Sequence, residues 1–234
     1  MAIFSTRRGG ISPKPFNSLN FSTEVGDDPY NLQYNLLQLM RWSSLPTQPH
    51  QAKQVHDTHS LWCEGPGEYH NIPADILLSQ HEDTPLAIRT ADCLPIMLAD
   101  VQRGIIAAVH AGWKGTANQI VKVAVDEMLA NGCTAENIIA SFGPCIEACC
   151  FEVNLPIANQ LYKTCDLPLP LIQPLRADLK EINQHQLLDI GVLNEHIEII
   201  SGCTHCQPEL YFSHRRDQFD AGRHLSIVAK HTLI

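Results

Sequence analysis

The chain has 234 residues, of which 44% are hydrophobic and 18% charged, and its formal net charge at pH 7 is −9. This length and apolar content are enough to bury the core of one large domain, so we expect a single domain over residues 1–234. The negative charge provides no basic surface for a phosphate backbone, which argues against a nucleic-acid partner and favours a small-molecule substrate.

The N-terminal residues 1–20 contain no continuous apolar stretch of signal-peptide length. No later segment approaches the roughly 20 apolar residues that a membrane-spanning helix needs. We therefore expect a soluble, cytoplasmic protein with no membrane partner. The nine cysteines are an odd number in a long chain without an export signal, so reduced thiols are expected rather than a disulfide framework.

The clearest regular pattern begins after Pro85. Short apolar runs punctuated by Asp, Pro and Gly predict strands at 86–90, 94–99 and 104–110. Residues 112–115 form a turn in this prediction, which leaves His110 at the carboxyl end of its strand. Ligands usually bind at that end of a strand in α/β folds.

A helix is predicted to follow this turn. Thr116 would cap the helix, with Gln119 returning the hydrogen bond in a capping box, and an apolar stripe would end before Gly132. Residues 138–142 are predicted to form the next strand. The alternation of strand, turn, helix and strand indicates a mixed α/β fold.

The C-terminal third has the same mixed character. Three prolines within residues 166–176 exclude both a helix and a central strand, so this segment is expected to be an extended surface loop. A helix is predicted over residues 178–189, and further strands are predicted at 197–201, 210–213 and 225–229. The fold class is therefore α/β (α+β), a single-domain mixed-sheet sandwich of the α/β/β/α type.

Three separate segments each place a metal-competent side chain between apolar strand residues and a turn. They are KQVH, ADC and VHAGW, which contain His56, Cys93 and His110. A lone histidine at a strand end is more often a hydrogen-bonded core or surface residue. The three segments together are more informative than any one of them.

The sequence resembles the purine nucleoside phosphorylase family formerly called multicopper polyphenol oxidoreductase or laccase-domain proteins. The resemblance extends over nearly the whole chain, because motifs similar to those of the family occur in order. They are FSTRRGG (4–10), SLN (18–20), VGDDP (25–29), KQVH (53–56), ADCLP (91–95), VHAGWKG (109–115), GPCIEACCFEV (143–153), GCT (202–204), FSHRR (212–216) and GR (222–223).

The resemblance implies a zinc ion bound by His56, Cys93 and His110. Zinc accepts imidazole nitrogen and thiolate sulfur, and three protein ligands leave a coordination position open, as in catalytic sites. There the metal could lower the pKa of bound water towards about 7 or polarise a substrate oxygen. Copper at the same ligands is an alternative, and the fourth ligand is left open.

The candidate catalytic residues are Cys93, His110 and Asp92, where Asp92 has the alternative role of supporting the metal ligands by a hydrogen bond. Arg7 and Asn20 match motif positions that line the pocket of the family. A phosphorolytic enzyme also needs a fixed cation for phosphate, for which Arg7 and Arg215 are candidates.

The sequence departs from the family pattern at four positions, Asp57, Lys114, Glu147 and His214. The family usually has glycine, arginine, glycine and tyrosine there, respectively. None of these changes removes a proposed metal ligand. Lys114 presents a point charge where arginine would present a bidentate fork, so the departures bear on substrate contacts.

A second group of thiols is also present. Cys203 and Cys206 form C-x-x-C, and Cys145, Cys149 and Cys150 cluster elsewhere. These residues allow a structural four-cysteine zinc site or a redox pair. Because a second C-x-x-C and a thioredoxin-like context are both missing, the sequence favours buried free thiols.

The expected activity is zinc-dependent phosphorolysis of a purine nucleoside (adenosine, inosine or methylthioadenosine) to base and ribose 1-phosphate, with adenosine deamination as a second activity. One alternative is an amidohydrolase that edits cell-wall precursors, with Cys93 as nucleophile and His110 as base. A copper-dependent polyphenol oxidase is a weaker alternative, because no H-x-H pair occurs. The last alternative is a non-enzymatic interaction module that zinc stabilises. The oligomeric state stays open.

Overall fold

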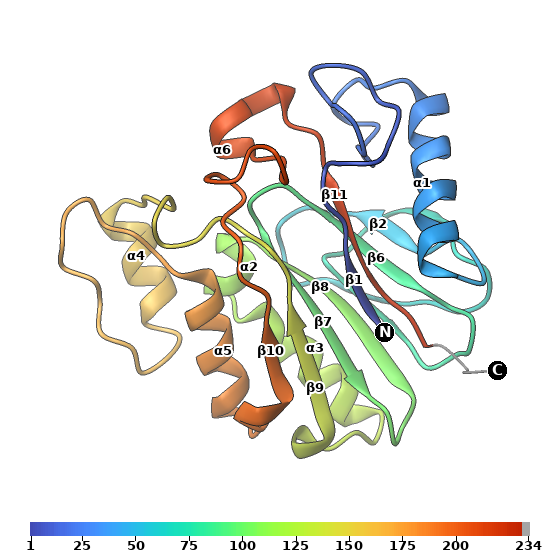
Figure 1. Cartoon of the computed structure of the whole chain (residues 1–234). Helices are drawn as coiled ribbons and strands as arrows, with labels where there is room; N and C mark the ends of the chain where they lie inside the picture. The colour runs from blue at the N-terminus through green and yellow to red at the C-terminus, as the bar shows by residue number, and fades with distance from the viewer. Residues whose placement is uncertain (231–234) are drawn as a thin grey trace.

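The computed structural model describes residues 1–230, and the strands in this part of the chain form three sheets (Figure 1). The largest sheet has the strand order β10-β9-β7-β8-β5-β3, the second has the order β1-β11-β6, and β2 pairs with β4. The strands are β1 (Ala2–Phe4), β2 (Gln51–Lys53), β3 (Ser60–Trp62), β4 (Tyr69–Pro73), β5 (Ile76–Ser79), β6 (Leu86–Thr90), β7 (Leu94–Asp100), β8 (Ile105–Ala111), β9 (Ile138–Phe142), β10 (Ile197–Ile199) and β11 (His224–Val228).

The helices are α1 (Pro29–Ser43), α2 (Trp113–Ala117), α3 (Ile120–Ala130), α4 (Leu155–Tyr162), α5 (Leu179–Asp189) and α6 (His214–Asp217). The longer ones cover the outer faces of the two larger sheets. Helix α1 packs on the three-stranded sheet, and α3 and α5 pack on the six-stranded sheet. Between the sheets lies an apolar layer that includes Ile88, Met97, Ile106 and Val228. The predicted single-domain α/β/β/α class is therefore confirmed.

The ends of the longer helices follow from their sequences. Helix α1 begins after Asp28, whose side chain accepts a hydrogen bond from the amide of Tyr30, and proline occupies its first turn. Asp178 caps α5 in the same way, through the amides of Lys180 and Glu181. The predicted helix over 178–189 is thus confirmed with its cap.

The predicted capping box at Thr116 is wrong. Thr116 lies inside the short helix α2, and its hydroxyl accepts a hydrogen bond from the side-chain amide of Asn183. Helix α3 begins separately after Gln119, which has a left-handed φ of 57°. The chain therefore turns between two helices where the periodicity predicted one.

Other predicted elements were confirmed or corrected individually. Strands β6 and β9 have the predicted bounds, and β7, β8, β10 and β11 differ from the prediction only at their ends. Residues 210–213 do not form a strand. Their backbone instead supports the chain before α6, where the amide of Phe212 donates to His224.

The crossing of the chain between the two larger sheets positions the functional site. Strand β6 belongs to the small sheet and β7 to the large one, so residues 91–93 pass from one sheet to the other. Strand β8 ends beside this crossing, because Pro95 of β7 lies opposite His110 of β8. Cys93 and His110 are brought together by this register.

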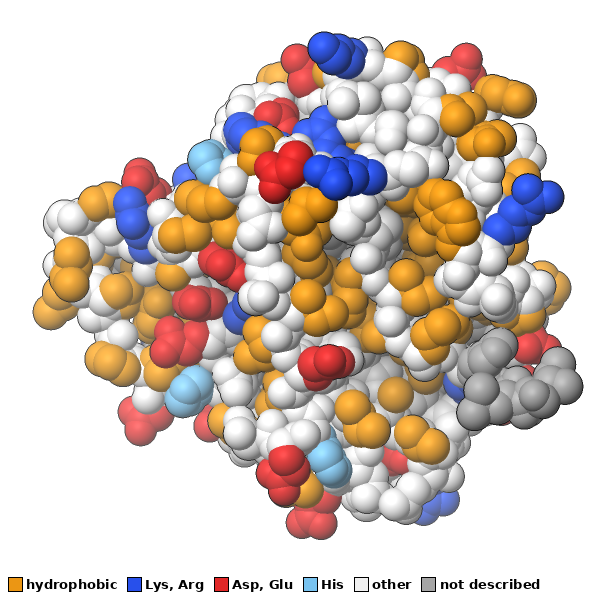
Figure 2. Space-filling view, viewed as in Figure 1, with side chains coloured by type: hydrophobic (Ala, Val, Ile, Leu, Met, Phe, Trp, Pro, Cys, Tyr) orange, Lys and Arg blue, Asp and Glu red, His pale blue; other side chains and the backbone are white. Residues whose placement is uncertain are grey.

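None of the helices within residues 1–230 is long and apolar enough to cross a membrane. On the face in Figure 2, Lys and Arg side chains are scattered among acidic and apolar ones, in agreement with the net charge of −9.

Candidate active site

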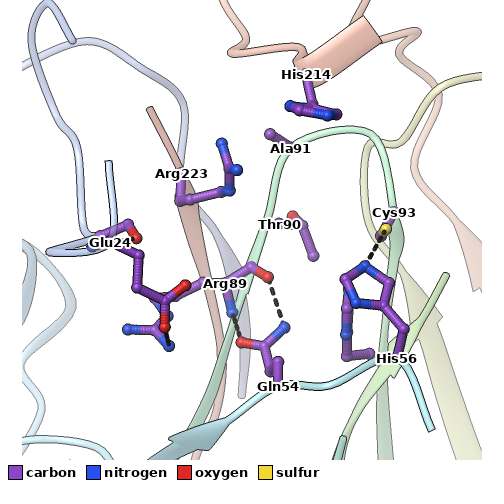
Figure 3. A pocket seen from close by; sticks show the side chains of 11 residues that line it. Glu24, Gln54, His56, Arg89, Thr90, Ala91, Cys93, His214 and Arg223 are labelled. Carbon is purple, nitrogen blue, oxygen red and sulfur yellow. Dashed lines mark hydrogen bonds and ion pairs between the residues drawn. The ribbon is translucent and has the colours of Figure 1, made fainter. Parts of the chain in front are cut away.

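Three side chains with metal-binding atoms meet at the edge of the crossing. His56, Cys93 and His110 each offer one ligand atom, and these atoms all lie within 4.8 Å of one another. Cys93 Sγ is 3.8 Å from His56 Nε2 (Figure 3), and the two imidazole rings are 4.7 Å apart in an edge arrangement. The separate segments KQVH, ADC and VHAGW therefore build one candidate metal site.

A buried carboxylate that the sequence analysis did not identify supports this site. Asp75 Oδ1 is 2.6 Å from His110 Nδ1, and both side chains are almost fully buried. The same carboxylate accepts hydrogen bonds from the amides of Val55, His56 and Asp57. Burial works to raise the pKa of Asp75, but these hydrogen bonds, led by that from His110, lower it. An ionised Asp75 thus directs the other ring nitrogen of His110 towards Cys93.

Two residues of the site have a left-handed backbone. The φ angle is 62° at His56 and 86° at Asp92, a region that side-chain-bearing residues seldom adopt. The carboxylate of Asp92 is held by the Thr204 hydroxyl and the Arg215 amide, each at 2.6 Å. Asp92 therefore fixes the turn that presents Cys93, and it does not line the pocket.

Gly112 gives the ligands room. A Cβ atom at this position would lie 3.0 Å from His56 Cδ2 and 3.1 Å from Cys93 Sγ. A side chain there would require His56 or Cys93 to shift by a few tenths of an ångström. Glycine at this position thus lets the two ligands approach the backbone closely.

Proximity of the thiol and the imidazoles shifts their proton affinities. Burial opposes ionisation of Cys93, but the facing side chains of His110 and His56 lower the pKa of its thiol to about 6. Burial also disfavours a charged His110, but Cys93 and Asp75 raise its pKa to about 9. Without a metal, the pair is therefore a thiolate and an imidazolium at neutral pH.

The three candidate ligands lie in the wall of a pocket that also contains cations (Figure 3). The other lining residues are Ser22, Glu24, Gln54, Arg89, Thr90, Ala91, His214 and Arg223. Gln54 holds the backbone of Arg89 by two hydrogen bonds of 2.8 Å, and Glu24 lies 3.6 Å from the Arg89 guanidinium. Arg223 donates to two neighbouring carbonyls at the far side of the pocket. Two arginines and the candidate metal ligands therefore line one pocket.

The three side chains predicted to bind substrate do not line this pocket. The guanidinium of Arg7 binds two carbonyls and lies over the Phe212 ring, that of Arg215 binds Glu152, and Asn20 is fully buried and bonded to Asp27. Asn20 also accepts a hydrogen bond from the Arg223 amide, so it supports a pocket residue. It stays a prediction that the substrate contacts Arg7, Asn20 and Arg215.

Sequence reasoning left several residues of the metal site and its pocket unassigned. Asp75 had one available signal, an acidic residue directly before the apolar strand β5, which pairs with the strand that carries His110. Arg223 lay in the last of the family-like motifs but received no role. Arg89 is hidden inside a predicted strand, and its guanidinium lies beside Glu24, on the side of the pocket away from Cys93 (Figure 3).

The fold and the site define a class of protein: a single-domain α/β/β/α sandwich with a His/Cys/His candidate metal site in a cation-lined pocket. Residues 1–231 match the family model described as multi-copper polyphenol oxidoreductase laccase, and the chain belongs to this family.

About a third of the residues of the chain are identical to those of named relatives. The chain is 34% identical to purine nucleoside phosphorylase YlmD of Geobacillus stearothermophilus, over 98% of this chain and 90% of that protein. It is 33% identical to purine nucleoside phosphorylase YfiH of Escherichia coli, over 97% and 92% respectively. The crystal structure of YlmD from Geobacillus stearothermophilus superposes with a TM-score of 0.90 at 32% identity, over 99% of this chain and 92% of that one.

Proposed function

We propose that the chain is a zinc-dependent purine nucleoside phosphorylase. The substrates would be phosphate and adenosine, inosine or methylthioadenosine, and the products the free base and the sugar 1-phosphate. The observation that carries the proposal is the convergence of His56, Cys93 and His110 on a cation-lined pocket. The names of the relatives, purine nucleoside phosphorylases with about a third of their residues identical, support the same reaction.

The residues present fit a zinc ion. Two imidazoles and one thiol are typical zinc ligands, and Asp75 occupies the place of the carboxylate that commonly orients a zinc-bound histidine. When bound, zinc would polarise a substrate oxygen or activate water at its open position. Copper at the same three ligands is the other candidate, although multicopper oxidation needs more histidines than this pocket contains.

The arginines of the pocket would bind the phosphate. In phosphorolysis an oxygen of phosphate forms a bond to ribose C1′ as the bond from C1′ to the base nitrogen breaks. Arg223 and Arg89 line the pocket that contains the candidate metal site, and a guanidinium binds phosphate through paired hydrogen bonds. Glu24, at the mouth beside Arg89, is an acceptor for a ribose hydroxyl.

Two further activities belong to the same pocket. Deamination of adenosine would use water in place of phosphate. Hydrolysis of an amide, as in editing of a cell-wall precursor, would use Cys93 as nucleophile, His110 as base and Asp75 as the orienting carboxylate. The low thiol pKa of Cys93 favours this second candidate in a metal-free protein. Metal content separates the candidates, because a thiolate bound to zinc is a poor nucleophile.

The experiment is a product analysis on protein whose metal content has been measured. Inosine and adenosine are each incubated with and without phosphate, and base, sugar and sugar phosphate are separated. Ribose 1-phosphate that depends on phosphate is the expected result, and its absence refutes the phosphorylase. Inosine formed from adenosine without phosphate would reveal the deaminase.

A reducing cytoplasm is the proposed location, supported by nine cysteines that are all free.

A further inference from the structure

A second set of thiols lies outside the pocket, where the segments after β9 and β10 meet. The two strands are parallel neighbours, with Phe142 opposite Ile199, so the chain leaves both at the same edge of the sheet (Figure 1). The segments then pair through a bridge between Cys145 and Cys203. This pairing brings the C-x-x-C motif of residues 203–206 beside the adjacent cysteines of residues 149–150.

Four sulfur atoms converge there, those of Cys149, Cys150, Cys203 and Cys206. They all lie within 4.8 Å of one another. The Sγ of Cys206 is 3.7 Å from that of Cys149 and 3.2 Å from that of Cys150. Metal–sulfur bonds of about 2.3 Å in a tetrahedron give sulfur–sulfur edges of about 3.8 Å. The four sulfur atoms are therefore close enough to one another to bind a single metal ion.

This arrangement corrects the interpretation of the sequence. Free buried thiols were expected, but Cys149 and Cys206 are exposed and Cys150 is half-buried. Exposed thiols gain little by packing, so hydrophobic burial does not account for their convergence. The adjacent cysteines of residues 149–150 take the place of a second C-x-x-C motif. They lie beside residues 203–206 because β9 and β10 are parallel neighbours.

Backbone contacts hold the two cysteine segments together around Cys203. The amide of Thr204 donates to the Cys145 carbonyl at 2.9 Å, and the amide of Gly202 donates to the Glu147 carboxylate at 3.0 Å. Lys180 donates to the same carboxylate at 2.8 Å. The sulfur atoms are therefore carried by segments that are fixed to each other.

We propose that Cys149, Cys150, Cys203 and Cys206 bind one zinc ion in a closed site, separate from the pocket. Four thiolates leave no open position, so the site has a structural role. A disulfide would use two of the sulfurs and leave the other two without a partner, whereas one ion engages all four. The proposal uses no residue of the pocket and does not depend on the proposed function.

The ion would stabilise the turn that carries Cys93. Ile146 donates its amide to the Asp92 carbonyl at 2.9 Å, and Thr204 donates its hydroxyl to the Asp92 carboxylate at 2.6 Å. Each of these partners lies on one of the two segments that the ion would join. An ion at the thiol site would therefore fix the two segments whose residues Ile146 and Thr204 donate hydrogen bonds to Asp92.

The test counts zinc per chain in the full-length protein, purified with a reductant and without chelator. His56→Ala removes a ligand of the pocket, and Cys206→Ser removes a ligand of the thiol site. We expect His56→Ala to retain one zinc ion and Cys206→Ser to lose that ion. Cobalt added to metal-free His56→Ala should give the absorption of a tetrahedral tetrathiolate centre. Cys165→Ser, which alters a thiol outside the cluster, should leave the count unchanged.

Two results would overturn the proposal. One is folded His56→Ala protein without metal, and the other is Cys206→Ser protein with the zinc content of the unmutated chain. A disulfide between Cys150 and Cys206, found by mass spectrometry after purification with reductant, would equally exclude the site. Cys149→Ser provides a second variant at an exposed position if Cys206→Ser does not fold. If the pocket binds no zinc, His56→Ala will contain as much zinc per chain as the unmutated protein. That result is distinct from the loss of zinc at the thiol site.

Discussion

Asp75 and His110 form a short, buried side-chain contact beside the candidate metal site, with 2.6 Å between Asp75 Oδ1 and His110 Nδ1. The same carboxylate receives the backbone amide of His56 at 3.0 Å. One buried acid therefore positions two of the three candidate ligands, one through its ring and the other through its backbone.

Replacement of this acid should weaken the metal site. Asp75→Asn removes the charge that orients His110, and loss of such a partner typically costs 10- to 100-fold in metal affinity. We expect a decrease of about this size in zinc affinity, measured by competition with a chelator, and a parallel decrease in turnover. Asp57→Asn alters a nearby exposed acid and serves as control. Unchanged affinity in Asp75→Asn would show that the contact does not support the metal.

Gly112→Ala should act on the metal site by steric crowding. The new Cβ would lie 3.0 Å from His56 Cδ2 and 3.1 Å from Cys93 Sγ. Overpacking of this kind costs about 1–3 kcal/mol, equivalent to roughly ten- to hundredfold in affinity. Gly115→Ala is the matched control, because its Cβ would face Ile120 rather than a ligand. Equal zinc affinities in the two variants would contradict the crowding.

Arg223→Gln should raise the KM for phosphate. A hydrogen bond to a charged group contributes about 1.5–3 kcal/mol, so an increase of about tenfold to a hundredfold is expected, with a smaller effect on the KM for the nucleoside. The same substitution at Arg7 and at Arg215 tests the two cations that the sequence predicted. A larger effect at either of them than at Arg223 would assign phosphate binding to that residue instead.

His224 should make the protein sensitive to acid. Burial, reinforced by nearby arginines, lowers its pKa to about 3, and its Nε2 accepts the amide of Phe212 at 2.9 Å. Between pH 6.5 and 3 the unfolded chain binds a proton here that the folded chain does not, so stability falls as the pH falls. The decrease should approach about 1.4 kcal/mol per pH unit in that window.

Urea unfolding at pH 7, 6 and 5 measures this effect. His224→Gln keeps a donor and an acceptor but cannot titrate, so its free energy of unfolding should fall less steeply with decreasing pH than that of the unmutated protein. Parallel pH dependences in the two proteins would show that His224 does not cause the sensitivity.

Local patterns predicted the parts of the fold that depend on local sequence. Short apolar runs identified β6 and β9 at their observed bounds, and Asp178 marked the beginning of α5. The helix over residues 116–131 was misplaced, because its periodicity continues through Gln119, where the backbone turns left-handed. The pattern of apolar residues does not depend on the backbone conformation of one residue, so it cannot predict such a turn.

The candidate site was predictable to a lesser extent. His56, Cys93 and His110 lie in recognisable segments, whereas the contact between Asp75 and His110 depends on the pairing of β5 with β8. The four-thiol cluster likewise depends on the parallel pairing of β9 with β10. Both are products of strand neighbours that are distant in sequence, and spacing alone does not indicate them.

The large sheet is bounded by β10 and β3, and each of these strands has only three residues. A short edge presents few free amides and carbonyls to a strand of another molecule. Extension of the sheet from one molecule into the next therefore gains little, and the folded protein should resist this route to aggregation even at high concentration.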